Sequence, residues 1–245
     1  MLKRIIFLLF AFTAVVSAQV RPGLKLGYNL GGVNSEFVGV YSYDITGKPS
    51  PNHPNAAGYP QNFKMISGFQ IGMIADCPIN DAFAIQPGAR FAMQGFIDEY
   101  RSGAAHIRRF SLFYLQVPVY AQYRWNVAEE TNVLFQAGPY AGIGLFGRQS
   151  HNTGGSNQDL DHRNKTINFR EDFDKALDYG ISIGAGIEFY RFQLVAAYDF
   201  GLNKANFKKN QTGYLYNLDM RNHCFSVTLA VIFGRRDPLF SQRDF

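Results

Sequence analysis

The chain has 245 residues, of which 16% are aromatic and only 18% are charged, and its formal net charge is +5. Its lysines and arginines are scattered rather than clustered, which argues against nucleic acid as a partner. No apolar run long enough for a membrane-spanning helix occurs after the first 18 residues. The length is suited to one all-β domain or to one or two ordinary domains.

The first residues have the pattern of a secretory signal peptide. Lys3 and Arg4 precede an apolar stretch at 5–16, and Val16-Ser17-Ala18 places small residues where a signal peptidase reads the chain. The apolar stretch is too short to span a membrane. We therefore expect residues 1–18 to be removed and residues 19–245 to form the folded protein.

Strict alternation of apolar and polar residues is the strongest pattern in the rest of the chain. Between Leu177 and Tyr190, for example, Ile181 and Ile183 alternate with Ser182. A period of two predicts a β-strand with two unlike faces and excludes a helix. Eight segments share this pattern: Leu24–Gly32, Lys64–Ala75, Phe83–Gly95, Phe110–Trp125, Asn132–Phe146, Leu177–Tyr190, Phe192–Leu202 and Met220–Phe233.

The connections between these segments alternate in length. Short connections occur at 77–82, 126–131 and 190–191, and long ones at 33–63, 96–109, 147–176 and 203–219. Short turns at one rim and long loops at the other are typical of transmembrane barrels. The sequence therefore predicts an all-β fold, an eight-stranded antiparallel up-and-down transmembrane β-barrel that occupies residues 19–245 as a single domain with both ends in the periplasm.

The composition of each face of the predicted strands indicates whether that face lines the lumen or contacts lipid. The polar face consists mainly of glycine, glutamine, asparagine and serine, which suits a narrow lumen filled by side chains. A soluble barrel would instead present a charged face to water. We therefore expect the apolar face to contact outer-membrane lipid, with an aromatic girdle near the periplasm formed by Phe83, Tyr123, Trp125, Phe189, Phe192 and Phe233.

Several charged residues fall on the polar, lumen-facing side of their strands. This expected lumen charge network consists of Lys25, Asp76, Arg90, Arg124, Glu188 and Asp199. Lys25, Asp76, Arg124 and Glu188 should lie at one level near the periplasmic mouth, with Arg124 in contact with Glu188 or Asp76. Buried charges must be paired, so we expect a structural plug of ion pairs, with a gate for small ions as the alternative.

The two cysteines, Cys77 and Cys224, are expected to be free. Cys77 falls in a predicted periplasmic turn, whereas Cys224 falls early in the last strand, near the outer surface. The barrel would separate them by most of the membrane thickness, far beyond the roughly 7 Å between Cα atoms that a disulfide can bridge.

Three motifs suggest chemistry that the predicted fold does not support. The glycine pattern of Gly142–Gly147 is followed by a polar loop rather than the helix that a dinucleotide site needs. His223 and Ser226 are three residues apart on one strand and should point to opposite faces. The 151–165 loop mixes histidine, aspartate and basic residues, as a solvated loop does. We therefore expect no enzyme activity, no cofactor and no metal site.

Five stretches resemble a known family, and together they cover essentially all of the chain after the signal. They are GLKLGYNLGG, GFQIGMIADCPINDAFAIQPGARF, FYLQVPVYAQYRW, FQAGPYAGIGL and DYGISIGAGIEF. The chain resembles the small outer-membrane β-barrel domain proteins of Bacteroidota, often labelled PorT-like or porin family. The resemblance implies a barrel in the cell outer membrane, and the namesake's role as an accessory protein of a secretion system is one implied function.

These expectations favour a non-enzymatic outer-membrane barrel with a structural or interaction role. Its long extracellular loops would contact a protein partner. An accessory subunit of an outer-membrane secretion machine and a narrow pore remain as alternatives.

Overall fold

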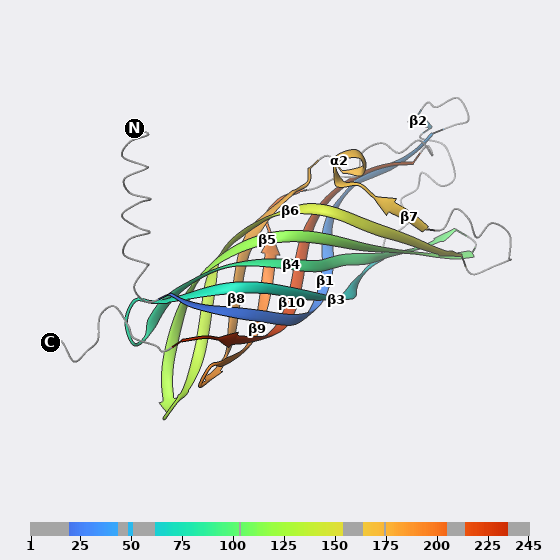
Figure 1. The fold of residues 1–245 in the computed structure, drawn as a ribbon. Coiled ribbons are helices and arrows are strands. Elements are labelled where there is room, and N and C mark those ends of the chain that lie inside the picture. Colours follow the sequence, from blue (N-terminus) through green and yellow to red (C-terminus); the bar gives the residue numbers. More distant parts are fainter. Residues whose placement is uncertain are drawn as a thin grey trace, which may run out of the picture.

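The computed structural model describes residues 20–43, 49–50, 62–102, 104–153, 164–173, 175–204 and 214–234. They form eight long strands, two short strands and one short helix (Figure 1). Within them, no helix is both long and apolar enough to cross a membrane. The elements are β1 (Arg21–Tyr43), β2 (Pro49–Ser50), β3 (Asn62–Pro78), β4 (Phe83–Ser102), β5 (Ala104–Ala128), β6 (Thr131–Thr153), β7 (Asn164–Ile167), α2 (Phe169–Asp172), β8 (Leu177–Phe189), β9 (Phe192–Gly201) and β10 (Tyr214–Ile232).

The eight long strands form a closed ring. Their order is β10-β9-β8-β6-β5-β4-β3-β1, and β10 pairs with β1 to complete it. All of these pairings are antiparallel. The short strands β2 and β7 pair only with β1 and β6. The predicted eight-stranded antiparallel barrel is therefore confirmed.

The two faces of the wall have the polarity that the alternation predicted. On β8, the side chain of Ile183 is exposed, whereas that of its neighbour Ser182 is completely buried in the lumen. The bilayer core contains no water that could hydrogen-bond to free backbone N–H and C=O groups. Because the sheet is closed, these groups bond to neighbouring strands instead. The predicted girdle residues are all exposed on the outer face: Phe83, Tyr123, Trp125, Phe189, Phe192 and Phe233.

One end of the barrel, called here the short-turn end, is closed by tight turns. The β3–β4 turn is held by Asn80, whose Oδ1 accepts hydrogen bonds from the backbone N–H groups of Ala82 and Phe83. The β5–β6 and β8–β9 turns place Glu130 and Tyr190 at positive φ, as tight turns between antiparallel strands require. The short connections were thus predicted at their observed places, but two of them were predicted too long: Cys77 lies in β3, residues 126–128 lie in β5, and Thr131 begins β6.

The opposite end, called the long-strand end, differs from the prediction. Segment 96–109 was expected to be a loop, but β4 and β5 continue to pair as far as Ser102 and Ala104. Likewise, β1 and β10 pair as far as Ser42 and Tyr214, inside the predicted loops 33–63 and 203–219. Register shifts interrupt the pairing here, one between β1 and β10 at Phe37 and one between β3 and β4 beyond Met65, opposite Gly95 with φ +155°.

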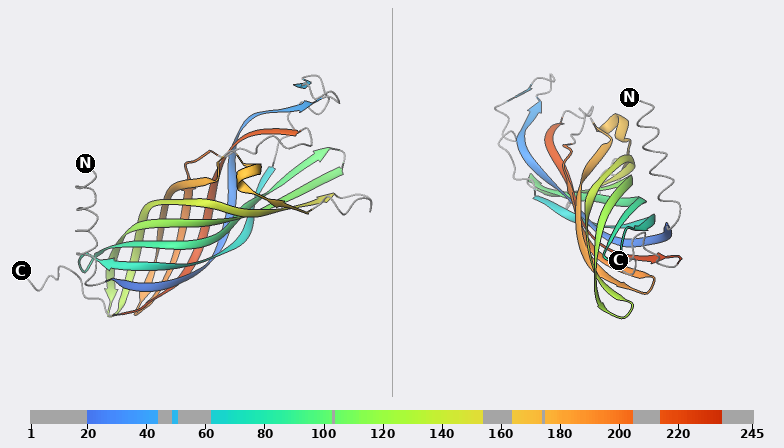
Figure 2. Two further views of the ribbon diagram at one scale, coloured as in Figure 1. Left: turned by 45° about the horizontal axis from the view of Figure 1, so that its top comes forward. Right: turned by 90° about the vertical axis from the view of Figure 1, so that its left-hand side faces the viewer.

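The sheet separates at the long-strand end. Pairing between β1 and β3 stops at Gly31 and Ile66, and pairing between β9 and β10 stops at Phe200 and His223. Beyond these points β1 and β10 leave the ring together as a two-stranded ribbon, while β4, β5 and β6 continue as a separate group (Figure 2).

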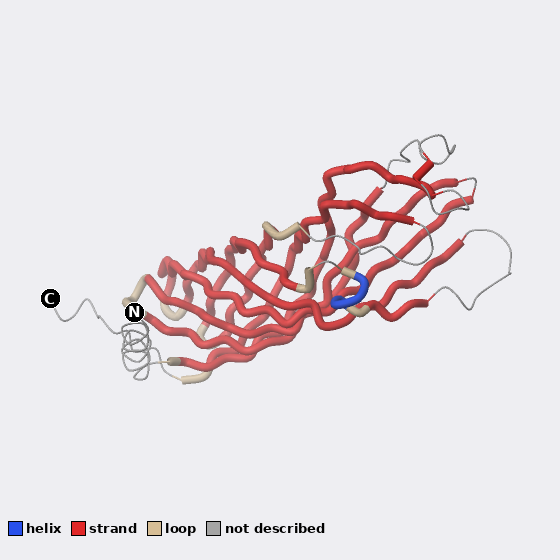
Figure 3. The backbone as a smooth tube through the Cα atoms, turned by 90° about the horizontal axis from the view of Figure 1, so that it is seen from above, coloured by secondary structure: helices blue, strands red, loops and turns tan. Residues whose placement is uncertain are grey.

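A short helical segment, absent from the all-β prediction, lies at the long-strand end (Figure 3). Asn168 caps α2 by accepting a hydrogen bond from the backbone N–H of Arg170. Phe169 and Phe173 stack on each other with ring centroids 4.9 Å apart, and Phe169 packs on Tyr114 of β5. Residues 169–173, called here the aromatic plug, join a buried apolar cluster formed with Val33, Phe96, Phe110, Leu112, Tyr114, Ile167 and Met220.

Candidate functional site

The lumen near the short-turn end is crossed by a chain of ion pairs. Arg21 of β1 and Asp76 of β3 are direct neighbours in the strand register. Nη2 of Arg21 lies 2.5 Å from Oδ2 of Asp76, and Nη2 of Arg124 lies 2.5 Å from Oδ1 of the same carboxylate. Asp76 has no exposed surface. Two guanidinium groups therefore neutralise and orient one fully buried carboxylate.

A second carboxylate extends this chain across the lumen. Nε of Arg124 lies 3.3 Å from Oε2 of Glu188 on β8. Glu188 also accepts hydrogen bonds from Nε2 of Gln193 at 2.6 Å and from Nδ2 of Asn132 at 3.2 Å. Arg124 thus contacts both carboxylates that the sequence offered as alternatives. We call Arg21, Asp76, Arg124 and Glu188 the charge cluster; its formal charges cancel.

A separate ion pair lies elsewhere in the lumen. Nη2 of Arg90 on β4 lies 2.5 Å from Oδ2 of Asp199 on β9. The same guanidinium donates hydrogen bonds to Gln116 at 2.8 Å and to Gln70 at 3.2 Å. Its carbon lies 5.7 Å from the ring centroid of Tyr140. This pair is called the mid-lumen pair. It links β4 to β9, two strands that are not neighbours in the barrel wall.

Lys25 does not join the charge cluster, contrary to the expectation from the sequence. Its Nζ lies 5.4 Å from the ring centroid of Tyr120, and it forms no ion pair with any described residue. Lys25 pairs in register with Gly72, which in turn lies opposite Arg90, so it belongs to the level of the mid-lumen pair. Arg21 occupies the expected position because β1 begins three residues earlier than the predicted strand.

Amide side chains occupy the lumen beside these charges. Nε2 of Gln86 donates to Gln193 at 3.1 Å, and Nε2 of Gln122 donates to Gln136 at 3.3 Å. All four side chains are buried. An eight-stranded barrel encloses a lumen just wide enough for side chains; here Gln86 and Gln193 hydrogen-bond across it, whereas Gln122 and Gln136 bond between adjacent strands.

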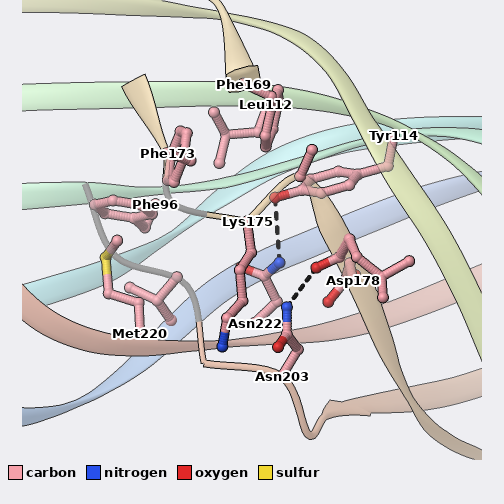
Figure 4. Close-up of a pocket in the computed structure, with 13 residues that line it drawn as sticks. Phe96, Leu112, Tyr114, Phe169, Phe173, Lys175, Asp178, Asn203, Met220 and Asn222 are labelled. Atoms are coloured by element: carbon pink, nitrogen blue, oxygen red, sulfur yellow. Dashed lines mark hydrogen bonds between the residues drawn. The ribbon is translucent and has the colours of Figure 1, made fainter. Parts of the chain in front are cut away.

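A small pocket lies between the aromatic plug and the polar groups beneath it (Figure 4). Its apolar side includes Phe169 and Phe173, and its polar side includes Asp178 and Asn222. Nδ2 of Asn222 donates to the hydroxyl of Tyr114 at 3.2 Å. The cavity measures about 10 Å³, room for about one water molecule. The plug therefore leaves space for about one water molecule in this pocket, and not for a larger ligand.

The motifs set aside from the sequence occupy unreactive positions. His223 lies on the outer face with its ring stacked on Tyr198 at 6.2 Å, whereas Ser226 is buried in the lumen, so the two cannot form a nucleophile–base pair. The glycines at 142–147 lie within β6. In the described part of the chain, no three histidine, cysteine, aspartate or glutamate residues are grouped to hold a metal. Asp159, Asp161 and His162 lie outside the described residues.

Both cysteines are free, as predicted. Cys77 is half-buried near the short-turn end of β3, and Cys224 is buried on the lumen face of β10. In the strand register Cys224 lies opposite Gly31, whereas Cys77 lies opposite Ile85 of a different strand pair.

Sequence reasoning missed Arg21 and the aromatic plug. The alternation could have predicted Arg21, because Arg21 continues the lumen-facing positions of Gly23 and Lys25 toward the start of β1. The plug had only a weak signal, an asparagine followed by two phenylalanines four residues apart. A four-residue helix is too short to produce a helical hydrophobic period.

Solved structures similar to this one are outer-membrane proteins of low sequence identity. OprG from Pseudomonas aeruginosa has a TM-score of 0.41 at 11% identity, covering 89% of this chain and 98% of that one. Ail from Yersinia pestis has a TM-score of 0.39 at 13% identity, covering 88% and 99%. Neisserial surface protein A has a TM-score of 0.39 at 12% identity, covering 86% and 97%. No curated protein matches the chain in sequence.

A family model supplies the assignment that these low scores do not. The model for the outer membrane protein beta-barrel domain matches residues 17–206. In barrels of the outer membrane the short turns face the periplasm and the longer connections face outward, which orients the two ends described above. With its closed ring of eight antiparallel strands, the chain is a protein of the outer membrane and belongs to the outer membrane protein beta-barrel domain family.

Proposed function

We propose that this protein is a non-enzymatic, sealed membrane anchor whose strand extensions at the long-strand end bind a protein partner outside the cell. The observation that carries the proposal is the obstruction of the lumen by three separate features. The charge cluster spans the lumen near the periplasm, the mid-lumen pair links β4 to β9, and the aromatic plug fills the outer mouth. A solute would have to displace all three.

The ion pairs make the seal a strong one. Separating Arg124 from Asp76 and Glu188 would leave charges with little water around them, and uncompensated buried charge costs several kcal/mol. The amides beside them are also hydrogen-bonded to one another. These contacts favour a closed barrel over a narrow pore.

The backbone at the long-strand end supports the binding role. Beyond Gly31 and Ile66, the facing edges of β1 and β3 do not pair with each other in the described part of the chain. Strand edges present free N–H and C=O groups. An extended segment of another protein can add to such an edge through main-chain hydrogen bonds.

The resemblance to PorT-like proteins suggests a narrower form of this proposal. In that form the partner is a subunit of a machine that exports proteins across the outer membrane, and the barrel is its accessory anchor. The unpaired edges suit this role, because they would let a neighbouring subunit extend the sheet.

Planar-bilayer recordings test the seal. We expect the full chain, refolded into lipid, to show no stepwise conductance, because the charge cluster, the mid-lumen pair and the aromatic plug each obstruct the lumen. Reproducible channel steps from the parent protein would contradict the sealed anchor.

Trimming the β4–β5 extension tests the binding role, because Glu99 pairs with Asn62 and so holds the end of β3 that offers a free edge to the partner. Asp98 and Arg108 lie opposite each other in register, so an Asn-Gly turn can replace residues 99–107 and close the hairpin there. The control is the same Asn-Gly replacement at Glu129-Glu130, in a turn at the short-turn end. After purification in mild detergent, the parent and the control should retain the same partner and the trimmed variant should lose it. A partner retained equally by all three proteins would contradict the assignment.

A further inference from the structure

Three basic residues lie on the outer wall of the barrel at the long-strand end. Lys64 of β3, Arg109 of β5 and Arg148 of β6 are all exposed. Lys64 and Arg109 lie on either side of Ile97 in one row of the sheet. With adjacent strands about 4.8 Å apart, their backbones are separated by roughly 10 Å.

Arg148 joins the same group from the next strand. It lies opposite Ser111, which is two residues along β5 from Arg109. Such diagonal neighbours have backbones about 7–8 Å apart, within reach of long side chains. Lys64, Arg109 and Arg148 therefore follow one another across β3 to β6 on the outer wall, and they are called here the basic patch.

A row of phenyl rings lies directly on the membrane side of the basic patch. Phe69, Phe91, Phe113 and Phe146 contact one another in turn across β3, β4, β5 and β6, with successive centroid distances of 6.4, 5.6 and 4.7 Å. Phe146 is only two residues, or about 7 Å, from Arg148 along the strand. The basic patch thus lies where the apolar belt of the barrel ends.

Two members of the basic patch, Arg109 and Arg148, are not neutralised in the way that the lumen charges are. Arg108 turns inward and lies 2.7 Å from Asp98, whereas the adjacent Arg109 turns outward. Neither Arg109 nor Arg148 forms an ion pair with any residue that the structure describes. At this height the outer wall therefore carries positive charge that a ligand can complement.

The opposite rim has another charge pattern. The exposed charged residues of the turns at the short-turn end are Asp81, Glu129, Glu130 and Arg191. Three of these four are acidic. The turns at the short-turn end therefore carry no comparable group of exposed cations.

We infer that the basic patch binds the phosphate group of a phosphorylated glycolipid in the outer leaflet, whose apolar part lies against the row of phenyl rings. Guanidinium groups bind phosphate through paired, charge-assisted hydrogen bonds. The patch faces sideways from the barrel wall and continues into lipid-facing aromatic surface. This placement favours a membrane lipid over a soluble anion, which would lack the apolar half of the contact.

Native mass spectrometry of the full chain released from nanodiscs tests this inference. The probe is lipid A in neutral phosphatidylcholine, compared with the same lipid after removal of its phosphates. We expect the parent to retain phosphorylated lipid A. A cation near an anionic surface contributes enough for about a fivefold change in affinity, so Arg109→Gln with Arg148→Gln should weaken retention about thirtyfold.

The matched control is Arg191→Gln, which removes an exposed arginine from the short-turn end. We expect it to retain lipid A like the parent. Each variant should keep the folded gel mobility of the parent before heating, because all three arginine side chains are exposed. Equal retention by the double variant, an equal loss in Arg191→Gln, or equal binding of the dephosphorylated lipid would each overturn the inference.

A soluble polyanion provides the remaining comparison. We expect inositol hexakisphosphate, at the concentration of lipid A, to leave lipid retention by the parent unchanged. If it displaced the lipid, or bound the parent in detergent as tightly as lipid A does, the site would be one for soluble polyanions and the assignment to a lipid would be wrong.

Discussion

The two ends of the barrel close the same lumen with different chemistry. At the short-turn end the seal is ionic, with Asp76 and Glu188 bridged by Arg124. At the long-strand end the seal is apolar, with Phe169 and Phe173 packed among aromatic and aliphatic side chains. The ionic seal depends on four strands in fixed register, whereas the apolar seal depends on one segment that folds back over the mouth.

This difference predicts different responses to substitution. Apolar contacts are non-directional, so a cluster can adjust when one member changes. A buried carboxylate that loses its cation has no comparable adjustment, because water does not reach it easily. Damage should therefore spread through the barrel from the ionic end and stay local at the apolar end.

The largest effect is expected for Arg124→Ala. The substitution removes a cation shared by two buried carboxylates and should lower the free energy of unfolding by about 3–5 kcal/mol. Urea unfolding in lipid vesicles can measure this change. The fluorescence of Trp125, the only tryptophan, is a suitable signal because the residue is next in sequence.

Neutralising a carboxylate should reverse part of this loss. In the double variant Arg124→Ala, Glu188→Gln, one unpaired charge is removed, while Arg21 still neutralises Asp76. We expect stability between those of the single variant and the parent. A single variant with the stability of the parent would show that the charge cluster does not support the barrel.

A substitution in the wall between the two ends is expected to have the next largest effect. Ile183→Arg places a charge on the lipid-facing surface, at a cost of about 2–4 kcal/mol near the bilayer midplane. The neighbouring substitution Ser182→Ala, on the lumen face, should change stability much less. Folded yield after dilution into vesicles compares them, and equal yields would contradict the assignment of the faces.

A smaller and more local effect is expected at the aromatic plug. Gly144 lies beneath Phe169, and a Cβ atom there would overlap its ring. Gly144→Ala should therefore displace the plug at a cost of about 1–3 kcal/mol. Hydrogen exchange should rise at 169–173 and not in β8 or β9.

Reducing the ring should restore the fit. Phe169→Leu, combined with Gly144→Ala, makes room for the added methyl group and should recover protection at 169–173. If exchange rose equally throughout the barrel, the two ends would not be independent. Conductance should stay absent in both variants, since the charge cluster is untouched.

The smallest test changes no residue and uses the labelling rates of the two thiols to report where each cysteine lies. Cys77 is half-buried and should react slowly in the folded barrel, whereas buried Cys224 should react only after unfolding. Unfolded, unreduced protein should give two reactive thiols. A single fast-reacting site at Cys224 would contradict its position in the lumen.

Much of the fold could be predicted because the two sides of a membrane barrel differ so strongly. Lipid outside and packed amides inside impose a period of two on the middle of every long strand. The same alternation oriented Asp76, Arg124 and Glu188 toward the lumen. It could not give relative heights, because strands in a barrel are tilted and staggered, which is why Lys25 lies at another level than expected.

The long-strand end was harder to predict because the membrane no longer imposes a pattern there. Beyond Gly95 the strands continue above the apolar belt, with register shifts in β1–β10 and β3–β4, so lipid and lumen no longer impose one alternation on every strand. Backbone hydrogen bonds hold those extensions together. Such bonds form with almost any side chain, so the amino-acid sequence gives little sign of them. The fold of the plug depends on contacts with distant strands, such as that between Phe169 and Tyr114.

The charge cluster has a consequence for how the barrel is inserted. Its members come from β1, β3, β5 and β8, so Glu188 meets Arg124 only after β8 has joined the sheet. A strand paired one residue out of register would turn its charged side chain from the lumen to the lipid. Misaligned intermediates are therefore penalised before the ring closes. The side chains that seal the finished barrel therefore also favour the correct register of its strands during assembly.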